Sequence, residues 1–157
     1  MKKNIIWVVL VMITYHILFK SPIPGQVIMA DEYVFTYGET YERVWDTYNE
    51  LPTKVKDMFE DNGYRIYVVS SIDNDEYILG QTRFMSRTIL IKNTGPFVER
   101  TVFHEFGHLL DDELAFSFIS KSDEFIDIYN SEKGNFKVDN NYDYFVSSHL
   151  EYFASAF

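Results

Sequence analysis

Ten residues in the second half of the chain, Thr101-Val-Phe-His-Glu-Phe-Gly-His-Leu-Leu110, carry an H-E-x-x-H pattern within a run of apolar residues. The apolar residues recur at helical spacing, which predicts a long helix from Phe97 to about Phe118. His104 and His108 are four residues apart, so on a helix they are rotated by only about 40° and can reach one metal ion from one face. Glu105 lies beside that face, where it can accept a proton from a water molecule. The stretch therefore predicts an α-helix that carries a metal site.

Two further residues of this predicted helix need an explanation. Gly107 stands in its interior, where glycine is destabilising by about 1 kcal/mol relative to alanine. Its presence indicates that another part of the chain packs closely against the helix backbone there. Asp111 returns to the His104 face after seven residues, and two interpretations are open: it orients a ligand histidine, or it lies at a solvated helix end.

The alternative to a metal site is a surface helix on which the His-Glu-His pattern is incidental. The apolar residues on both sides of the pattern predict a buried helix instead. Burying two histidines and a carboxylate without a metal ion would be costly, so the metal site is the favoured interpretation.

The third protein ligand of such a site is less clearly marked. The residue six positions beyond His108 is Leu114, so the third histidine that marks the metzincins is missing. Thermolysin-like sites instead take a glutamate from a later helix. Glu151 lies in an apolar helical segment, but Ser148-His-Leu-Glu151 also matches a capping box, in which the glutamate bonds back to the helix start. The residues alone leave both roles open, and the downstream candidates are Glu113, Glu124, Glu132 and Glu151.

The remaining sequence predicts helices, then a small sheet, then helices again. The chain has 157 residues, 46% of them apolar, which suits one globular domain. Periodicity, turn residues and caps together predict an α+β fold. The expected helices cover residues 39–51, a segment opened by Pro52 and stopped by Asn62-Gly63, the motif helix, a short helix capped by Ser122, and a terminal helix from Ser147 or Ser148; the expected strands are 65–70, 77–79 and 88–92.

Charge and cysteine content exclude several classes of function. The chain has 24 acidic and 14 basic residues, a net charge of −10, whereas nucleic-acid binders usually carry a basic surplus. No nucleic-acid partner is therefore expected. There is no cysteine, which excludes disulfides, cysteine-type zinc sites and thiol nucleophiles.

The first 30 residues have the order of an export signal. Lys2 and Lys3 precede an apolar run from Ile5 to Phe19, and Ala30 offers a small residue for cleavage. The run is shorter than the roughly 20 residues of a spanning helix, so a cleaved signal peptide is favoured over an uncleaved N-terminal anchor. We expect a secreted protein whose mature domain covers residues 31–157. With the anchor retained, the protein would instead sit at the membrane, on the outer face.

Three stretches of the chain carry a resemblance to a known family. These are His104-Glu-Phe-Gly-His108-Leu-Leu-Asp-Asp112, Phe125-Ile-Asp-Ile-Tyr129, and Tyr144 together with Glu151-Tyr-Phe-Ala-Ser-Ala-Phe157. From about Tyr41 to Phe157 the chain resembles the catalytic domain of anthrax lethal factor and the related secreted Pro-Pro endopeptidases. The resemblance implies a zincin-like metallopeptidase domain with N-terminal helices, a small mixed sheet, an active-site helix and a C-terminal ligand helix.

The resemblance also implies the site residues and the chemistry. One zinc ion would be held by His104, His108 and Glu151, with Glu105 as general base and Tyr144 as electrophilic helper. Tyr142 competes with Tyr144 for the helper role because it lies only two residues away. The activity implied is that of an exported zinc metalloendopeptidase acting on extracellular or surface proteins. Its peptide substrate would bind as an extended strand, antiparallel to an edge strand of the sheet, and residues 88–92 are the best candidate for that edge strand.

Two departures from the family pattern favour an alternative function. Ser155 stands where the family usually has an acidic residue, a position expected to touch the surroundings of the metal. The sequence also stops six residues after Glu151, where the family's helix runs on, so a domain truncated at its C-terminus is the alternative organisation. The corresponding alternative function is an inactive or truncated homologue that acts as a binding module at the cell surface.

Overall fold

The computed structural model describes residues 27–29, 38–93, 96–113, 118–135 and 142–157. Most of the predicted export segment therefore lies outside the described residues, and so does the predicted cleavage position. Within the described ranges, no helix is both long enough and apolar enough to span a membrane.

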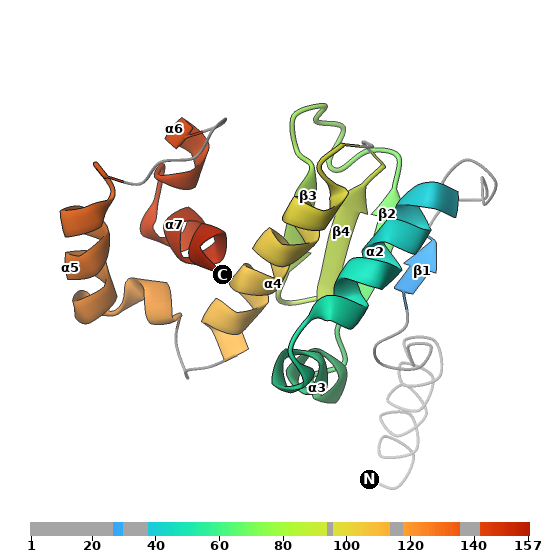
Figure 1. Ribbon diagram of the computed structural model, residues 1–157, viewed down its shortest axis with the longest axis horizontal. Helices are drawn as coiled ribbons and strands as arrows, with labels where there is room; N and C mark the ends of the chain where they lie inside the picture. Colours follow the sequence, from blue (N-terminus) through green and yellow to red (C-terminus); the bar gives the residue numbers. More distant parts are fainter. Residues whose placement is uncertain (1–26, 30–37, 94–95, 114–117, 136–141) are drawn as a thin grey trace, which may run out of the picture.

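The described elements form an α+β fold, as predicted (Figure 1). Helices come first, a small sheet follows, and further helices complete the chain. In order, the elements are β1 (Val27–Met29), α2 (Gly38–Glu50), α3 (Thr53–Asp61), β2 (Arg65–Val69), β3 (Gly80–Arg83), β4 (Thr88–Lys92), α4 (Val98–Glu113), the 3-10 turn η1 (Ile119–Lys121), α5 (Asp123–Glu132), α6 (Tyr142–Phe145) and α7 (His149–Ala156).

Local signals explain several of these boundaries. Gly63, which follows α3, has φ of +71°, a conformation that glycine adopts without steric cost. Ser122 and Ser148 precede α5 and α7, and their hydroxyls accept hydrogen bonds from the backbone N–H groups of Phe125 and Glu151. Helix α4 is described as far as Glu113, and the predicted continuation over 114–117 lies outside the described residues; Phe118 itself is not helical, with φ −47° and ψ 124°.

The sheet is mixed and has the strand order β1-β2-β4-β3. Strands β1, β2 and β4 run parallel, and β3 runs antiparallel to β4 with Gly80 opposite Ile91. The predicted strand at 77–79 is wrong, because pairing with β4 begins at Gly80 and the backbone N–H of Tyr77 bonds to the Asp75 side chain instead. Strand β4 has neighbours on both sides, so the predicted edge position of residues 88–92 is also wrong. The outer strand on that side is β3.

One face of this sheet forms the core against helices α2, α3 and α4. Strands β2 and β4 alternate between buried and half-buried residues, so only one face of each is fully covered. Figure 1 shows α2 and α4 side by side across that face. The fully buried centre consists of Val44, Phe59, Ile66, Val68, Ile89, Ile91, Val98, Val102, Phe106 and Leu109.

The C-terminal elements lie on the other side of α4, away from the sheet (Figure 1). Helix α7 packs along α4, and the closest approach is at Gly107. A Cβ atom at Gly107 would lie 2.6 Å from both the Cα and the carbonyl oxygen of Ala154. The close packing predicted from this glycine is therefore confirmed, and α4 is shared by the two halves of the molecule.

Strand β1 lies just before Ala30, the predicted cleavage position of the signal peptide. Val27–Met29 pairs in parallel with Ile66–Val68 of β2. Cleavage after Ala30 would therefore remove one strand of the sheet, whereas cleavage before Val27 would retain it.

Candidate active site

Helix α4 brings His104 and His108 together as the spacing predicts. The centroids of the two imidazole rings are 4.8 Å apart, and the ring planes are nearly perpendicular. His104 is only 8% exposed, because α7 covers it. The two Nε2 atoms face Glu151, the third residue of α7.

Glu151 completes a group of three side chains with metal-ligand chemistry. Its Oε2 atom lies 3.0 Å from Nε2 of His104 and 3.6 Å from Nε2 of His108. Ser148 caps α7 by accepting the backbone N–H of Glu151, so the serine half of the predicted capping box is present. The Glu151 carboxylate, however, is directed at the histidines.

The geometry of this group fits a zinc ion. Zinc bonds to nitrogen and oxygen ligands at about 2.0–2.2 Å, so tetrahedral ligands lie ~3.3 Å from one another. The two distances from Glu151 bracket that value, and the three ligand atoms all lie within 4.8 Å of one another. Two neutral imidazoles and one carboxylate also form a donor set typical of catalytic zinc. Among the described residues, these three form the one such group of His, Asp and Glu side chains.

The other glutamates considered as ligands lie away from this group. Glu124 is exposed on α5, and Glu113 is the last residue of α4. Glu132 accepts a hydrogen bond from the hydroxyl of Tyr152 instead.

The site carries its own electrostatic balance. Burial by itself would raise the pKa of the Glu151 carboxyl, but its hydrogen bonds with His104 and His108 lower the pKa well below the ordinary value. For His108, burial opposes the charged form, yet the contact with Glu151 and the charge of Glu105 raise its pKa overall. The negative charges of Glu105 and Glu151 therefore favour protonation of His108, and the two histidines favour ionisation of the carboxylates.

Glu105 occupies a pocket formed by strand β3. Its side chain is 3% exposed, and the hydroxyl of Thr82 donates a hydrogen bond to its Oε2 atom at 2.8 Å. A Cβ atom at Gly80 would lie 2.5 Å from the Oε1 atom of Glu105, so only glycine leaves room for the carboxylate. Burial raises the pKa of Glu105, although His108, His104 and the Thr82 hydroxyl act in the opposite direction.

Thr82 and Gly80 were not predicted as parts of the site. A glycine within a strand often marks a close approach of another group, and Gly80 carried that signal. Thr82 carried no local signal, because it contacts Glu105 across 23 residues of sequence.

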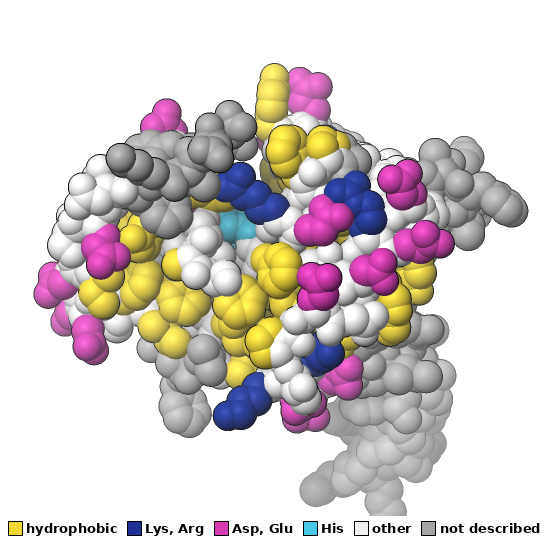
Figure 2. All heavy atoms as spheres, in the orientation of Figure 1, with side chains coloured by type: hydrophobic (Ala, Val, Ile, Leu, Met, Phe, Trp, Pro, Cys, Tyr) yellow, Lys and Arg dark blue, Asp and Glu magenta, His cyan; other side chains and the backbone are white. Residues whose placement is uncertain are grey.

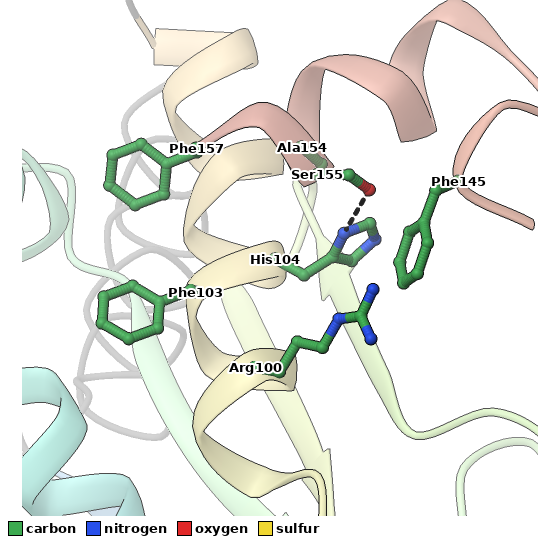
Figure 3. A pocket seen from close by; sticks show the side chains of 7 residues that line it. All are labelled: Arg100, Phe103, His104, Phe145, Ala154, Ser155 and Phe157. Carbon is green, nitrogen blue, oxygen red and sulfur yellow. Dashed lines mark hydrogen bonds between the residues drawn. The ribbon is translucent and has the colours of Figure 1, made fainter. Parts of the chain in front are cut away.

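Ser155 contacts the ligand histidine His104, as expected from the family pattern (Figure 3). Its hydroxyl donates a hydrogen bond to the carbonyl of Glu151 at 2.7 Å, so the same oxygen is left to accept from Nδ1–H of His104 at 3.3 Å. Coordination of a metal ion by Nε2 would place the imidazole proton on Nδ1, where the Ser155 oxygen faces it. The Nε2 lone pair is then available on the side of Glu151, where a metal ligand needs it.

Asp111 serves neither of its two predicted roles. It is fully buried, and its carboxylate accepts hydrogen bonds from the backbone N–H of Ser120 at 2.7 Å and from the Ser120 hydroxyl at 2.6 Å. Both interpretations are therefore wrong. Asp111 anchors the turn η1 to the end of α4.

Tyr144 lies at the open side of the site, in the short helix α6. Its ring centroid is 5.9 Å from that of His104, and half of its side chain is exposed. Partial burial and the negative charge of Glu151 raise the pKa of its phenol, so the hydroxyl remains protonated and able to donate. Tyr142 belongs to the same helix.

A hollow opens next to His104, between α4 and the C-terminal elements. Figure 2 shows histidine in a depression of the surface, with a basic side chain at its rim and hydrophobic side chains below. Figure 3 shows the side chains that line the hollow around His104, with the guanidinium of Arg100 pointing toward the imidazole and the ring of Phe145. Of the three residues with metal-ligand chemistry, His104 is the one that lines this hollow.

Comparisons with known proteins identify the fold and the family of this chain. The chain has the same fold as the Pro-Pro endopeptidase PPEP-2 from Paenibacillus alvei, with a TM-score of 0.54 and 20% sequence identity over 83% of this chain and 81% of that one. A search of curated proteins found no match. The family described as anthrax toxin lethal factor, N- and C-terminal domain, matches residues 38–157. Because that match spans most of the chain and includes every element of the site, this protein belongs to the anthrax toxin lethal factor domain family.

Proposed function

We propose that this protein is an exported, zinc-dependent metalloendopeptidase. The observation that carries the proposal is the meeting of His104 and His108 on α4 with Glu151 on α7, at 3.0 and 3.6 Å. The fold shared with a Pro-Pro endopeptidase supports a peptide substrate. Export rests on the order of residues 1–30, in which a basic start precedes an apolar run and a small residue.

His104, His108 and Glu151 would hold one zinc ion per chain. When bound, zinc acts as a Lewis acid toward a carbonyl group and lowers the pKa of a coordinated water to about 7. With zinc on Nε2 of His104, the ring proton would lie on Nδ1, and the Ser155 oxygen 3.3 Å away would accept it.

Glu105 would move the proton during hydrolysis. Its carboxylate is one residue from His104, is held at Oε2 by Thr82, and is closed off by Gly80. In this position it takes a proton from the attacking water and delivers it to the amine that leaves. Burial raises the pKa of Glu105 toward neutral pH. A pKa near the working pH suits a group that must first accept a proton and then donate it.

Tyr144 would stabilise the negative charge that develops on the scissile carbonyl oxygen. Its ring lies beside His104 at the open side of the site, and its hydroxyl stays protonated. A phenol in this position donates a hydrogen bond to an oxygen that becomes negative only in the transition state.

The peptide would lie along β3 rather than along β4. Strand β3 is the outer strand of the sheet on this side, and no other described strand pairs with its free edge. Thr82 and Gly80 of the same strand contact Glu105, so a peptide paired with β3 would pass next to the base. Backbone pairing of this kind supplies affinity without a requirement for particular side chains.

One experiment tests the proposed activity. Purified protein is incubated with a peptide library, with and without a chelator, and cleavage sites are identified by mass spectrometry. We expect cleavages that disappear with the chelator and return with added zinc. An inactive homologue would instead bind zinc or peptides without cleaving any of them.

The ligand assignment is tested separately by metal content. We expect one zinc per chain in the parent protein and a large loss of affinity in His104→Ala, His108→Ala and Glu151→Ala. Glu124→Ala is the matched control and should retain zinc. Retention by Glu151→Ala together with loss in Glu113→Ala or Glu124→Ala would show that the third ligand is another glutamate.

A further inference from the structure

The hollow beside His104 contains a basic group that the proposed mechanism does not use. Arg100 lies four residues before His104 on α4, so both side chains emerge from the same face of the helix. Arg100 is exposed and lines the hollow together with His104 and Phe145. Figure 3 shows its guanidinium between the imidazole of His104 and the ring of Phe145.

The guanidinium is held in place by an aromatic ring and not by a carboxylate. Its Cζ atom lies 4.2 Å from the centroid of the Phe145 ring, so one face of the group is covered. Two acidic residues of the neighbouring structure have other partners: Glu99, next to Arg100 in sequence, binds Arg43 at 2.5 and 2.6 Å, and Glu151 binds His104 at 3.0 Å. Among the described residues no acidic group pairs with Arg100. Within the described part of the chain, its in-plane N–H donors are therefore not occupied by a carboxylate.

The rest of the hollow defines what that ligand looks like. Its lining includes three aromatic rings: that of Phe145 lies beside the guanidinium, and those of Phe103 and Phe157 lie on the other side of α4 (Figure 3). Such a lining favours an apolar stem, while a guanidinium edge matches a carboxylate in a bidentate arrangement. A glutamate side chain combines an aliphatic stem with a terminal carboxylate.

We propose that this hollow is a substrate subsite that binds a carboxylate group of the peptide through Arg100, with a glutamate side chain near the scissile bond as its best occupant. The inference rests on the proposed peptidase function and specifies its substrate class. It also gives Arg100 a role in a chain whose net charge of −10 would otherwise repel acidic peptides. A free C-terminal carboxylate has the same chemistry, and the test separates the two sources.

The test uses peptides that differ at one position near the scissile bond. Glutamate is compared with glutamine and aspartate, and a peptide that ends in a free carboxylate is compared with its amide. We expect kcat/KM for the glutamate peptide to exceed that for the glutamine peptide by about 10-fold, as for one charge-assisted pair. A preference confined to the free C-terminal carboxylate would assign the hollow to the chain end and overturn the glutamate assignment.

Variants of Arg100 link the preference to this side chain. Arg100→Gln should remove the difference between glutamate and glutamine peptides, and Arg100→Glu should reverse it in favour of a lysine peptide. Lys56→Glu on α3 makes the same change of charge away from the hollow and should leave the preference intact. An equal loss of preference in Lys56→Glu, or an unchanged preference in Arg100→Gln, would overturn the proposal.

A binding measurement keeps this test independent of cleavage. The same peptides are titrated into zinc-loaded parent protein and Arg100→Gln, and dissociation constants are measured by calorimetry. If the parent binds the glutamate peptide more tightly than the glutamine peptide, and Arg100→Gln does not, the subsite is supported. This result would support the subsite even if no peptide is cleaved, and only the proposed activity would then fail. Equal dissociation constants for the glutamate and glutamine peptides would overturn the subsite.

Discussion

Glu105 shows how much of the site is decided by single side chains. Its carboxylate lies beneath β3, with the Thr82 hydroxyl at 2.8 Å and no space for a side chain at Gly80. A carboxylate held in one orientation can act on a proton without first reorganising, which is the advantage of a preorganised site. The contacts with Thr82 and Gly80 thus hold the Glu105 side chain in one conformation.

We expect Glu105→Gln to separate chemistry from structure. Glutamine keeps the size of the side chain and its contact with Thr82, but it cannot accept the proton. Peptidase activity should fall by about 10²-fold or more, while zinc content and thermal stability stay close to those of the parent. Activity is measured on a peptide identified in the library, and near-normal turnover would show that another group activates the water.

Ser155 should act on metal affinity through His104. Ser155→Ala removes the acceptor for Nδ1–H at 3.3 Å, so the tautomer of His104 is no longer fixed. Loss of such a contact typically lowers metal affinity by about 10–100-fold. Calorimetric zinc titration measures the change, and Ser155→Thr, which retains a hydroxyl, should restore most of it. Equal zinc affinities of all three proteins would exclude this positioning role.

At the scale of elements, the packing of α7 on α4 sets the position of Glu151. The two helices approach so closely that the backbone of Ala154 fills the place of a side chain at Gly107. The position of Glu151 therefore depends on a helix contact that lies three residues further along α7. Small residues at such a contact are structural requirements of the site.

Gly107→Ala should consequently weaken both stability and zinc binding. The added methyl group would lie 2.6 Å from Ala154, so α7 must shift and carry Glu151 with it. Overpacking of this kind costs about 1–3 kcal/mol, more than the ~1 kcal/mol gained in helix propensity. Denaturant unfolding and zinc titration measure the two effects. Gly134→Ala is the control, because nothing lies within 4 Å of a Cβ atom there, and it should change neither quantity.

The ion pair between α2 and α4 gives the fold a measurable pH dependence. The hydrogen bonds from Arg43 lower the pKa of Glu99 below its ordinary value. A lowered pKa in the folded state stabilises the fold above the unfolded-state pKa of about 4.3, and this contribution is lost as the pH falls through the folded value. The Glu99 side chain is 47% exposed, so we expect less than about 1 kcal/mol from the pair.

Glu99→Gln tests this contribution. In chelator, the variant should be less stable than the parent above about pH 5, and the difference should shrink as the pH falls below about 4. Unfolding by denaturant at several pH values measures the difference, with Glu50→Gln as a control on an exposed residue of α2. A difference that grows with falling pH would contradict the assignment.

In the whole molecule, α4 lies between the sheet with its helices and the C-terminal helices. Each of these two parts supplies different side chains to the site. The sheet and helices α2 and α3 form the main core and hold Glu105 through β3. The C-terminal helices supply Glu151, Ser155 and Tyr144 from the other side. A metal bound between α4 and α7 would therefore tie the second part to the first.

Removing zinc should lower the melting temperature of the whole domain. A ligand present at 100 times its dissociation constant stabilises the folded state by about 2.7 kcal/mol, which corresponds to roughly 5–10 °C for a domain of this size. Differential scanning calorimetry with zinc and with chelator measures the shift. His104→Ala should show no zinc-dependent shift, and an equal shift in that variant would place the metal elsewhere.

The sequence by itself determined the features that depend on residues close together in the chain. The spacing of His104 and His108 on a helix, the cap at Ser148 and the need for close packing at Gly107 all follow from local geometry, and the structure confirms each of them. The resemblance added Glu151, which local periodicity could not separate from a capping glutamate. The structure brings its carboxylate to the two histidines.

Only the tertiary structure decided which strand is the outer one and what surrounds the base. Strand β3 occupies the edge because it folds back on β4, and pairing with β2 covers the other side of β4. Thr82 reaches Glu105 across 23 residues of sequence, and Ser155 reaches His104 across 51. Such contacts depend on strand register and on how closely two helices pack, and neither leaves a periodic signal in the chain. The sequence therefore indicated the reactive groups, while long-range packing determined which side chains orient them.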